Sequence, residues 1–224
     1  MPGHKAPEEQ RRAAILRAAF VVASRERLEG LTVRKVAAQA GVSPGLVHFH
    51  FGEREALLVA LLGWLLRHTV PAGELRDILD APAFVDAAPR TRLLALVRRD
   101  IEHLPRRRDR VELFFDYWVM GTRNPAVRAT IRRALDRYRD AFLPVATDVV
   151  RAEPDRYEGV TPLELAAVVA SFVEGCALRV VLTPDDFDVG RYLAAVQALV
   201  DRPAAAPRSA GLPPGIAFPS VPTT

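Results

Sequence analysis

Apolar residues recur with helical spacing in a short segment between residues 33 and 40. Val33, Val36, Ala37 and Ala40 fall on one face of this segment, and polar side chains occupy the other face. Gly41 follows at once, and glycine readily adopts the left-handed conformation that ends many helices. The pattern therefore predicts a short helix that packs one face on a core and ends at residue 40.

A second short helix is predicted to begin after Ser43. The Ser43 hydroxyl can cap it, and Pro44 suits its first position, where no backbone donor is needed. Val47 and Phe51 lie four residues apart and would anchor the helix to the core. Its other face combines small, polar and aromatic side chains, namely Gly45, His48 and Phe49. Two helices joined by so short a turn form a helix-turn-helix unit, whose second helix can lie in a DNA major groove.

Helical spacing of apolar residues also dominates the rest of the chain. We expect further helices over about 8–27, 53–69, 90–104, 105–122, 126–150, 162–182 and 189–200. Residues 74–89 are expected to form a short helix and a loop, and residues 1–7 a loose arm. The predicted fold class is therefore all-α, with about nine helices.

Two helices near the end of the chain are apolar on more than one face. Apolar side chains nearly surround the predicted helix 162–182, and residues 187–201 form a second apolar helix. Such helices need a partner beyond their own domain, so we expect them to form a homodimer interface as a four-helix bundle from two subunits. Residues 203–224 are rich in proline and are expected to be a disordered tail.

Charge is distributed unevenly along the chain of 224 residues. The first 54 residues carry nine basic and five acidic side chains, which accounts for the whole formal net charge of +4. A polyanion would therefore bind near the N-terminus. The single cysteine, Cys176, excludes an intrachain disulfide and suits a reducing cytosol. No signal peptide is indicated, and the longest apolar run is too short to span a bilayer, so we expect a cytoplasmic protein without a membrane partner.

The residues that could support catalysis are not arranged for it. His68 and His103 have no cysteine neighbours or metal-ligand spacing, and His48 and His50 point in different directions on a helix. No glycine-rich phosphate loop occurs. We therefore predict no enzyme activity, no metal site and no cofactor.

Five sequence blocks occur in order between residues 11 and 62. They are Ala-Ala-Ile-Leu-Arg-Ala-Ala-Phe (13–20), Gly-Leu-Thr-Val-Arg-Lys-Val-Ala (30–37), Ala-Gly-Val-Ser (40–43), His-Phe (50–51) and Arg-Glu-Ala-Leu-Leu (54–58). Together they resemble the DNA-binding domain of TetR-family transcriptional regulators. The resemblance implies that these residues face DNA: Thr32, Arg34, Ser43, Pro44, Gly45, Leu46, His48, Phe49, His50 and Arg54. The family usually has Tyr where His48 stands and Lys where Arg54 stands, and both side chains are expected to contact phosphates.

Weaker motifs follow in the second half of the chain. They are Phe-Phe-Asp-Tyr-Trp (114–118), Asn-Pro (124–125) and Phe-Val-Glu-Gly-Cys-Ala-Leu (172–178), and they resemble ligand-binding domains of the BetI-like branch of the family. Ligand pockets are mostly apolar and aromatic with a few polar groups. The candidate ligand-binding residues are Phe114, Asp116, Tyr117, Trp118, Phe172 and Glu174. Two alternatives stay open, because aromatic residues at helical spacing can be core residues and Glu174 can make a structural hydrogen bond.

The expected organisation has three parts. A three-helix helix-turn-helix DNA-binding domain occupies residues 1–54, a larger helical ligand-binding and dimerisation domain occupies 55–202, and the tail occupies 203–224. The predicted function is a homodimeric, ligand-responsive repressor that binds a palindromic operator in double-stranded DNA and an unidentified small-molecule effector. The alternatives are an activator of the same family and a small-molecule-binding helical protein that has lost DNA recognition. His48 in place of Tyr and the small charge excess would favour the last.

Overall fold

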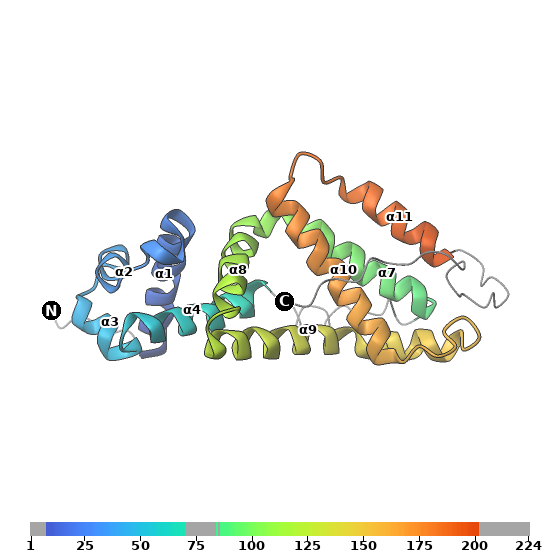
Figure 1. The fold of residues 1–224 in the computed structure, drawn as a ribbon, viewed down its shortest axis with the longest axis horizontal. Coiled ribbons are helices and arrows are strands. Elements are labelled where there is room, and N and C mark those ends of the chain that lie inside the picture. The colour runs from blue at the N-terminus through green and yellow to red at the C-terminus, as the bar shows by residue number, and fades with distance from the viewer. Residues whose placement is uncertain (1–7, 70–83, 85, 202–224) are drawn as a thin grey trace, which may run out of the picture.

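The computed structural model describes residues 8–69, 84 and 86–201, and all regular structure in these ranges is helical (Figure 1). The first four helices are α1 (Glu8–Gly30), α2 (Val33–Ala40), α3 (Pro44–Phe51) and α4 (Arg54–Thr69). They are followed by α7 (Pro89–His103), the short 3-10 helix η1 (Pro105–Arg107), α8 (Arg108–Gly121), α9 (Pro125–Ala152), α10 (Pro162–Leu182) and α11 (Val189–Asp201). The prediction of an all-α fold is confirmed.

The molecule is elongated, with the helix-turn-helix unit at one end. Helices α1, α2 and α3 gather there, and α4 leads from them toward α8 (Figure 1). The long helix α9 runs through the other part of the molecule, where α7, α8 and α10 pack on it. Helix α11 contacts α7 at the far side. The surface of α3 is thus well separated from the later helices.

The caps expected around the helix-turn-helix turn are present. Gly41 ends α2 in the left-handed conformation, with φ 65° and ψ 33°. The Ser43 hydroxyl caps α3 by accepting a hydrogen bond from the backbone N–H of Leu46, at 3.2 Å. Thr32 caps α2 in the same way, because its hydroxyl accepts from the backbone N–H of Lys35 at 3.3 Å. These local signals fix the angle at which α3 leaves the turn.

One hydrophobic core joins α1 to α4 with α8 and the beginning of α9. Leu57, Leu61 and Leu65 of α4 are fully buried, in the same cluster as Ile15 of α1 and Tyr117 of α8. Residues on both sides of the domain boundary predicted at residue 54, such as Phe51 and Leu57, belong to this one cluster. The early turns of α4 therefore pack on the helix-turn-helix unit, and α4 also packs on α8 and α9.

A second core is built by α7, α9, α10 and α11. Ile101, Phe142 and Cys176 are among its buried members. By length and composition, α10 could also cross a membrane, since its most apolar window has a mean hydropathy of 2.0. Core helices of soluble proteins pass the same test, and α10 packs on α7, α8 and α9. Only 28% of that window is buried, so much of its apolar surface is uncovered.

The last turn of α1 breaks at Arg27. This residue has φ 62° and ψ 177°, a backbone conformation that is essentially confined to glycine. The helix end predicted at residue 27 coincides with this break, although one more turn continues to Gly30. Pro144 lies inside α9, which continues on both sides of it. The predicted arm, most of the segment 74–89 and the tail 203–224 lie outside the described residues.

Candidate DNA interface and effector cavity

Helix α3 has two faces of opposite character. Val47 and Phe51 are buried against the core, as their spacing predicts, whereas Phe49 on the other side is 78% exposed. Most of the other candidate DNA-binding residues are exposed as well, namely Thr32, Arg34, Ser43, Pro44, Gly45 and His48, and Leu46 is half-buried. The start of α2 and the outer face of α3 therefore form one open surface.

The ring of His48 is oriented by the residue that follows α3. Its Nδ1 lies 3.0 Å from the carbonyl oxygen of Gly52. A carbonyl oxygen only accepts, so Nδ1 carries a proton, and Nε2 of the neutral ring is left as an acceptor. The expected donation from His48 to a phosphate would thus require a ring protonated on both nitrogens.

The prediction that His50 faces DNA is wrong. Its side chain is only 2% exposed and both ring nitrogens lack a hydrogen-bond partner in the described structure. His50 lies three residues after Val47 and one before Phe51, so all three share the buried face of α3. The guanidinium of Arg12 in α1 closes this face, since it donates to the His50 carbonyl and lies 4.4 Å from the centre of the Phe51 ring.

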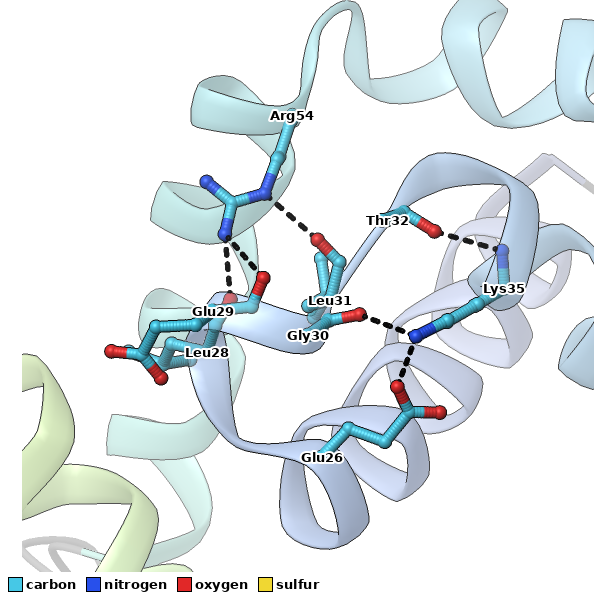
Figure 2. Close-up of polar contacts among 8 residues, drawn as sticks. All are labelled: Glu26, Leu28, Glu29, Gly30, Leu31, Thr32, Lys35 and Arg54. Carbon is cyan, nitrogen blue, oxygen red and sulfur yellow. Dashed lines mark hydrogen bonds and ion pairs between the residues drawn. The ribbon is translucent and has the colours of Figure 1, made fainter.

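Arg54 is also used differently from the prediction. Figure 2 shows its side chain reaching from α4 to the segment that ends α1. Its Nε donates to the carbonyl of Leu31 at 2.8 Å, and Nη2 donates to the carbonyl of Leu28 at 2.6 Å and approaches that of Glu29 at 3.5 Å. The guanidinium therefore satisfies backbone acceptors that the end of α1 leaves open. Arg54 thus bonds α4 to the α1–α2 connection, and its phosphate contact stays a prediction.

The two basic residues of α2 have different surroundings. The Lys35 ammonium binds the carboxylate of Glu26 and also donates to the carbonyl of Gly30 at 3.3 Å (Figure 2). Arg34 is exposed and makes no hydrogen bond or ion pair with any residue that the structure describes. Arg34 is therefore the cation on this surface that is available to a phosphate.

The central tyrosine of the aromatic block in α8 does not line a cavity. Tyr117 is fully buried, and its hydroxyl donates to the carbonyl of Leu58 in α4 at 2.8 Å. Burial raises the pKa of this hydroxyl, so it remains a donor at neutral pH. The prediction that Tyr117 binds a ligand is wrong, because its polar atom ties α8 to α4.

Asp116 likewise faces the N-terminal helices. Its carboxylate accepts a hydrogen bond from the guanidinium of Arg27 at 2.5 Å, and Glu112 lies 3.8 Å from the same guanidinium. Burial raises the pKa of Asp116, and Arg27 partly opposes that shift. The Arg27 side chain thus reaches α8 from a strained backbone position. Asp116 thus joins α1 to α8, and it lines neither the cavity beside α7 nor the hollow beside Trp118, so its binding of a ligand stays a prediction.

A partly open cavity of about 70 Å³ lies between α7, η1, α8, α9 and α10. That volume has room for roughly five water molecules, and so for a small organic molecule. The lining residues are Asp100, His103, Leu104, Arg107, Val111, Phe114, Leu135, Tyr138, Val173, Glu174 and Ala177. Of the predicted ligand-binding residues, Phe114 and Glu174 line this cavity. Trp118 lines a separate, more open hollow, and Phe172 packs beside the second core.

Two carboxylates in this cavity have different environments. The Asp100 carboxylate accepts a hydrogen bond from the hydroxyl of Tyr138 at 2.6 Å. Glu174 has no hydrogen bond or ion pair with any described residue, so its expected structural hydrogen bond is not formed there. Burial raises the pKa of Asp100 and also that of Glu174. The Glu174 carboxyl group is therefore unpaired in this cavity, which the aromatic rings of Phe114 and Tyr138 also line.

Both parts of the chain match known protein families. Residues 15–61 match "Bacterial regulatory proteins, tetR family", and residues 89–204 match "BetI-type transcriptional repressor, C-terminal". The second match alone covers more than half of the chain. The chain belongs to the TetR family.

Relatives of this TetR-family protein are transcriptional regulators. The BetI regulator of Paraburkholderia phymatum is 27% identical over 194 residues, which span 86% of this chain and 92% of the relative. A solved transcriptional regulator from Pseudomonas aeruginosa has a TM-score of 0.70 at 25% identity, and the match spans 88% of this chain and 91% of the regulator's chain. A regulator from Saccharomonospora viridis, solved in complex with choline, shares the fold with a TM-score of 0.69 at 18% identity, covering 88% and 98%. This TetR-family chain is a DNA-binding transcriptional regulator and not an enzyme.

The cavity of this TetR-family regulator contains residues that the sequence reasoning missed. Asp100 and Tyr138 form its buried hydrogen-bonded pair. Asp100 follows Leu93, Leu96 and Val97 on the buried face of α7. An acidic residue on an otherwise apolar stripe is the signal that could have identified it. Tyr138 gave no comparable signal, because tyrosine is common in cores.

Proposed function

We propose that the protein is a homodimeric, ligand-responsive repressor that binds a palindromic operator through α3. The observation that carries the DNA-binding part is the exposed surface of α3 and the start of α2. It combines the uncovered Phe49 ring with the unpaired cation of Arg34, while Val47 and Phe51 hold the helix on its scaffold. A recognition helix held in this way can enter a major groove.

The proposal of a homodimer rests on the uncovered apolar surface of α10. Val168 and Leu182 are 66% and 68% exposed, and Leu163 and Leu178 are exposed too. Surface of this kind on a long helix marks an interaction site. A second copy packing α10 and α11 against the same helices would cover it and would give two α3 helices. Two such helices would read half-sites about 34 to 36 Å apart on one face of DNA, hence a palindrome.

The proposed effector is a small organic cation held in the cavity. Support comes from the unpaired Glu174 carboxyl and the aromatic rings of Phe114 and Tyr138. The other carboxyl group of the cavity, Asp100, is already bound by Tyr138 and lies near Arg107. Carboxylates and aromatic faces together favour a quaternary ammonium group. The choline found in the fold neighbour from Saccharomonospora viridis has that chemistry.

DNA binding is tested by fluorescence anisotropy with duplexes that tile the region upstream of the gene, across a salt series. Saturable binding to one palindromic duplex is expected, with an affinity that falls steeply as salt rises. In a homodimer two copies of Arg34 meet the operator, so Arg34→Ala should lower the salt slope by about 2, whereas Arg137→Ala on α9 should leave it unchanged. Weak binding that is equal for every duplex would contradict the proposal.

Effector binding is tested by thermal shift and calorimetry with choline and with its neutral isostere 3,3-dimethylbutanol. Choline should stabilise the protein and release it from the operator, whereas the neutral isostere should do neither. Because burial raises the pKa of Glu174, choline affinity should fall as the pH drops through that raised pKa and the carboxylate is protonated. Glu174→Gln should remove the part of this pH dependence that comes from Glu174, and Asp100 in the same cavity keeps its own raised pKa. Equal binding of both probes would refute a cationic effector, and lower transcription on operator release would indicate an activator.

A further inference from the structure

The side chains of α3 exclude the commonest way of reading bases. Specific contacts in the major groove most often come from Arg or Lys to guanine and from Asn or Gln to adenine. Helix α3 reads Pro-Gly-Leu-Val-His-Phe-His-Phe and contains none of these four residue types. The Ser43 hydroxyl is engaged in capping, and His50 is buried. The exposed groups of α3 that remain are the His48 ring, whose Nδ1 is bound to the Gly52 carbonyl, and apolar side chains, so apolar contact gains weight in base recognition by α3.

Phe49 is the side chain best placed for such a contact. It has the largest exposed fraction, 78%, among the large hydrophobic side chains that the structure describes. In the described structure its ring contacts the His50 ring, with the two ring centres 5.2 Å apart and the ring planes at 76° to each other. Most of its apolar surface is therefore available to a partner.

The surface beside Phe49 is open toward the start of the helix. Gly45 lies four residues earlier, one helical turn away on the same side. A Cβ atom at Gly45 would meet nothing closer than the Ser43 hydroxyl oxygen, at 4.0 Å. The half-buried Leu46 borders this space with a second apolar side chain. A base edge can approach the Phe49 ring here without displacing a side chain.

One group in the major groove matches this surface. The 5-methyl of thymine is the apolar group that base pairs present there, and aromatic side chains contact it. We infer that Phe49 reads the methyl group of a thymine in each half-site of the operator. The inference rests on the proposed binding of α3 in the major groove, and it adds the base group that α3 recognises.

The test replaces each thymine of the operator in turn with deoxyuridine, which removes the 5-methyl and keeps base pairing. At one position per half-site, the substitution should weaken binding about fourfold, and in both half-sites together about fifteenfold, because about one buried methyl is lost each time. Substitution at the remaining thymines should change affinity less than twofold, a bound set by the absence of such a contact.

The Phe49→Ala variant decides whether this side chain makes the contact. It should bind the thymine operator more weakly, and it should no longer distinguish thymine from deoxyuridine at the sensitive position. Val119→Ala on α8 is the matched control, since Val119 is also an exposed apolar residue, at 69%. This control should keep the full preference for thymine. Far-ultraviolet circular dichroism verifies that both variants are folded.

Three results would overturn the inference. The first is an operator in which no thymine is sensitive to loss of its methyl, and the second is a deoxyuridine penalty that persists in Phe49→Ala. In both cases the protein still binds its operator, so the proposed function stands. The third is the absence of saturable binding to any duplex, which would remove the DNA-binding proposal together with the inference.

Discussion

Substitution of Arg54 separates its structural role from a role in DNA binding. Arg54→Met keeps most of the aliphatic stem and removes every donor, whereas Arg54→Lys keeps the charge with a single donor group. In the structure two donors of the guanidinium bind the carbonyls of Leu28 and Leu31 at 2.6 and 2.8 Å. Methionine cannot make either bond, and lysine cannot span both acceptors as a planar fork does.

The expected loss of stability follows from these two bonds. A hydrogen bond that involves a charged group contributes about 1.5 to 3 kcal/mol, and Leu28 and Leu31 are both buried. Because the Arg54 side chain is only partly buried, water can replace some of what is lost, and the lower end of the range applies. We therefore expect Arg54→Met to cost about 3 kcal/mol, and Arg54→Lys about half of that.

Thermal unfolding and operator binding are measured on the same preparations. A loss of about 3 kcal/mol should lower the melting temperature by roughly 6 to 12 °C for a chain of this size. Below the transition both variants should keep the salt slope of operator binding. The reasoning would be refuted by a Met variant that is as stable as the unchanged protein but has a salt slope lower by about 2, because that result identifies one phosphate contact in each subunit of the proposed homodimer.

Three further substitutions test other contacts. Tyr117→Phe should cost about 1 to 2 kcal/mol in urea unfolding, because it removes the buried bond to Leu58, and should leave choline affinity unchanged by calorimetry. Arg27→Ala and Arg27→Gly both lose the ion pair with Asp116, but glycine relieves the backbone strain, so the Gly variant should be more stable by about 1 to 3 kcal/mol. Burial raises the pKa of Asp100, so the stability that its protonated form contributes is lost as the pH rises through that raised pKa. Melting curves should therefore show Asp100→Asn more stable than the unchanged protein at pH 7, with a difference that shrinks as the pH falls through the same range.

The helix-turn-helix unit could be predicted because its signals are local. Gly41, Ser43 and the spacing of Val47 and Phe51 each act within one or two turns, and the structure shows the caps and buried face that they imply. His50 shows the limit of carrying a family motif over residue by residue. Its helical spacing from Val47 already placed it on the buried face, and the motif alone did not reveal this.

The ligand site was predicted only in part because its residues come from four helices and a connecting turn. The dense aromatic block in α8 suggested a pocket, but successive residues of a helix point in different directions. Phe114 therefore faces the cavity while Tyr117 faces α4. The direction of each side chain depends on which helices pack around α8, and that long-range packing is not contained in the spacing of one segment. The structural role of Arg54 was missed for the same reason, since its carbonyl partners lie more than 20 residues earlier.

Helix α8 is the element through which effector and DNA can influence each other. Phe114 lines the cavity, Asp116 binds the guanidinium of Arg27 in α1, and Tyr117 donates to α4. These three residues lie within one turn of a rigid helix, so an effector that shifts α8 acts on α1 and α4 together. Both helices share a core with α3, whose orientation therefore depends on the position of α8. Coupling between two binding sites is reciprocal, so if the proposed effector weakens operator binding by a given factor, operator binding weakens effector binding by the same factor.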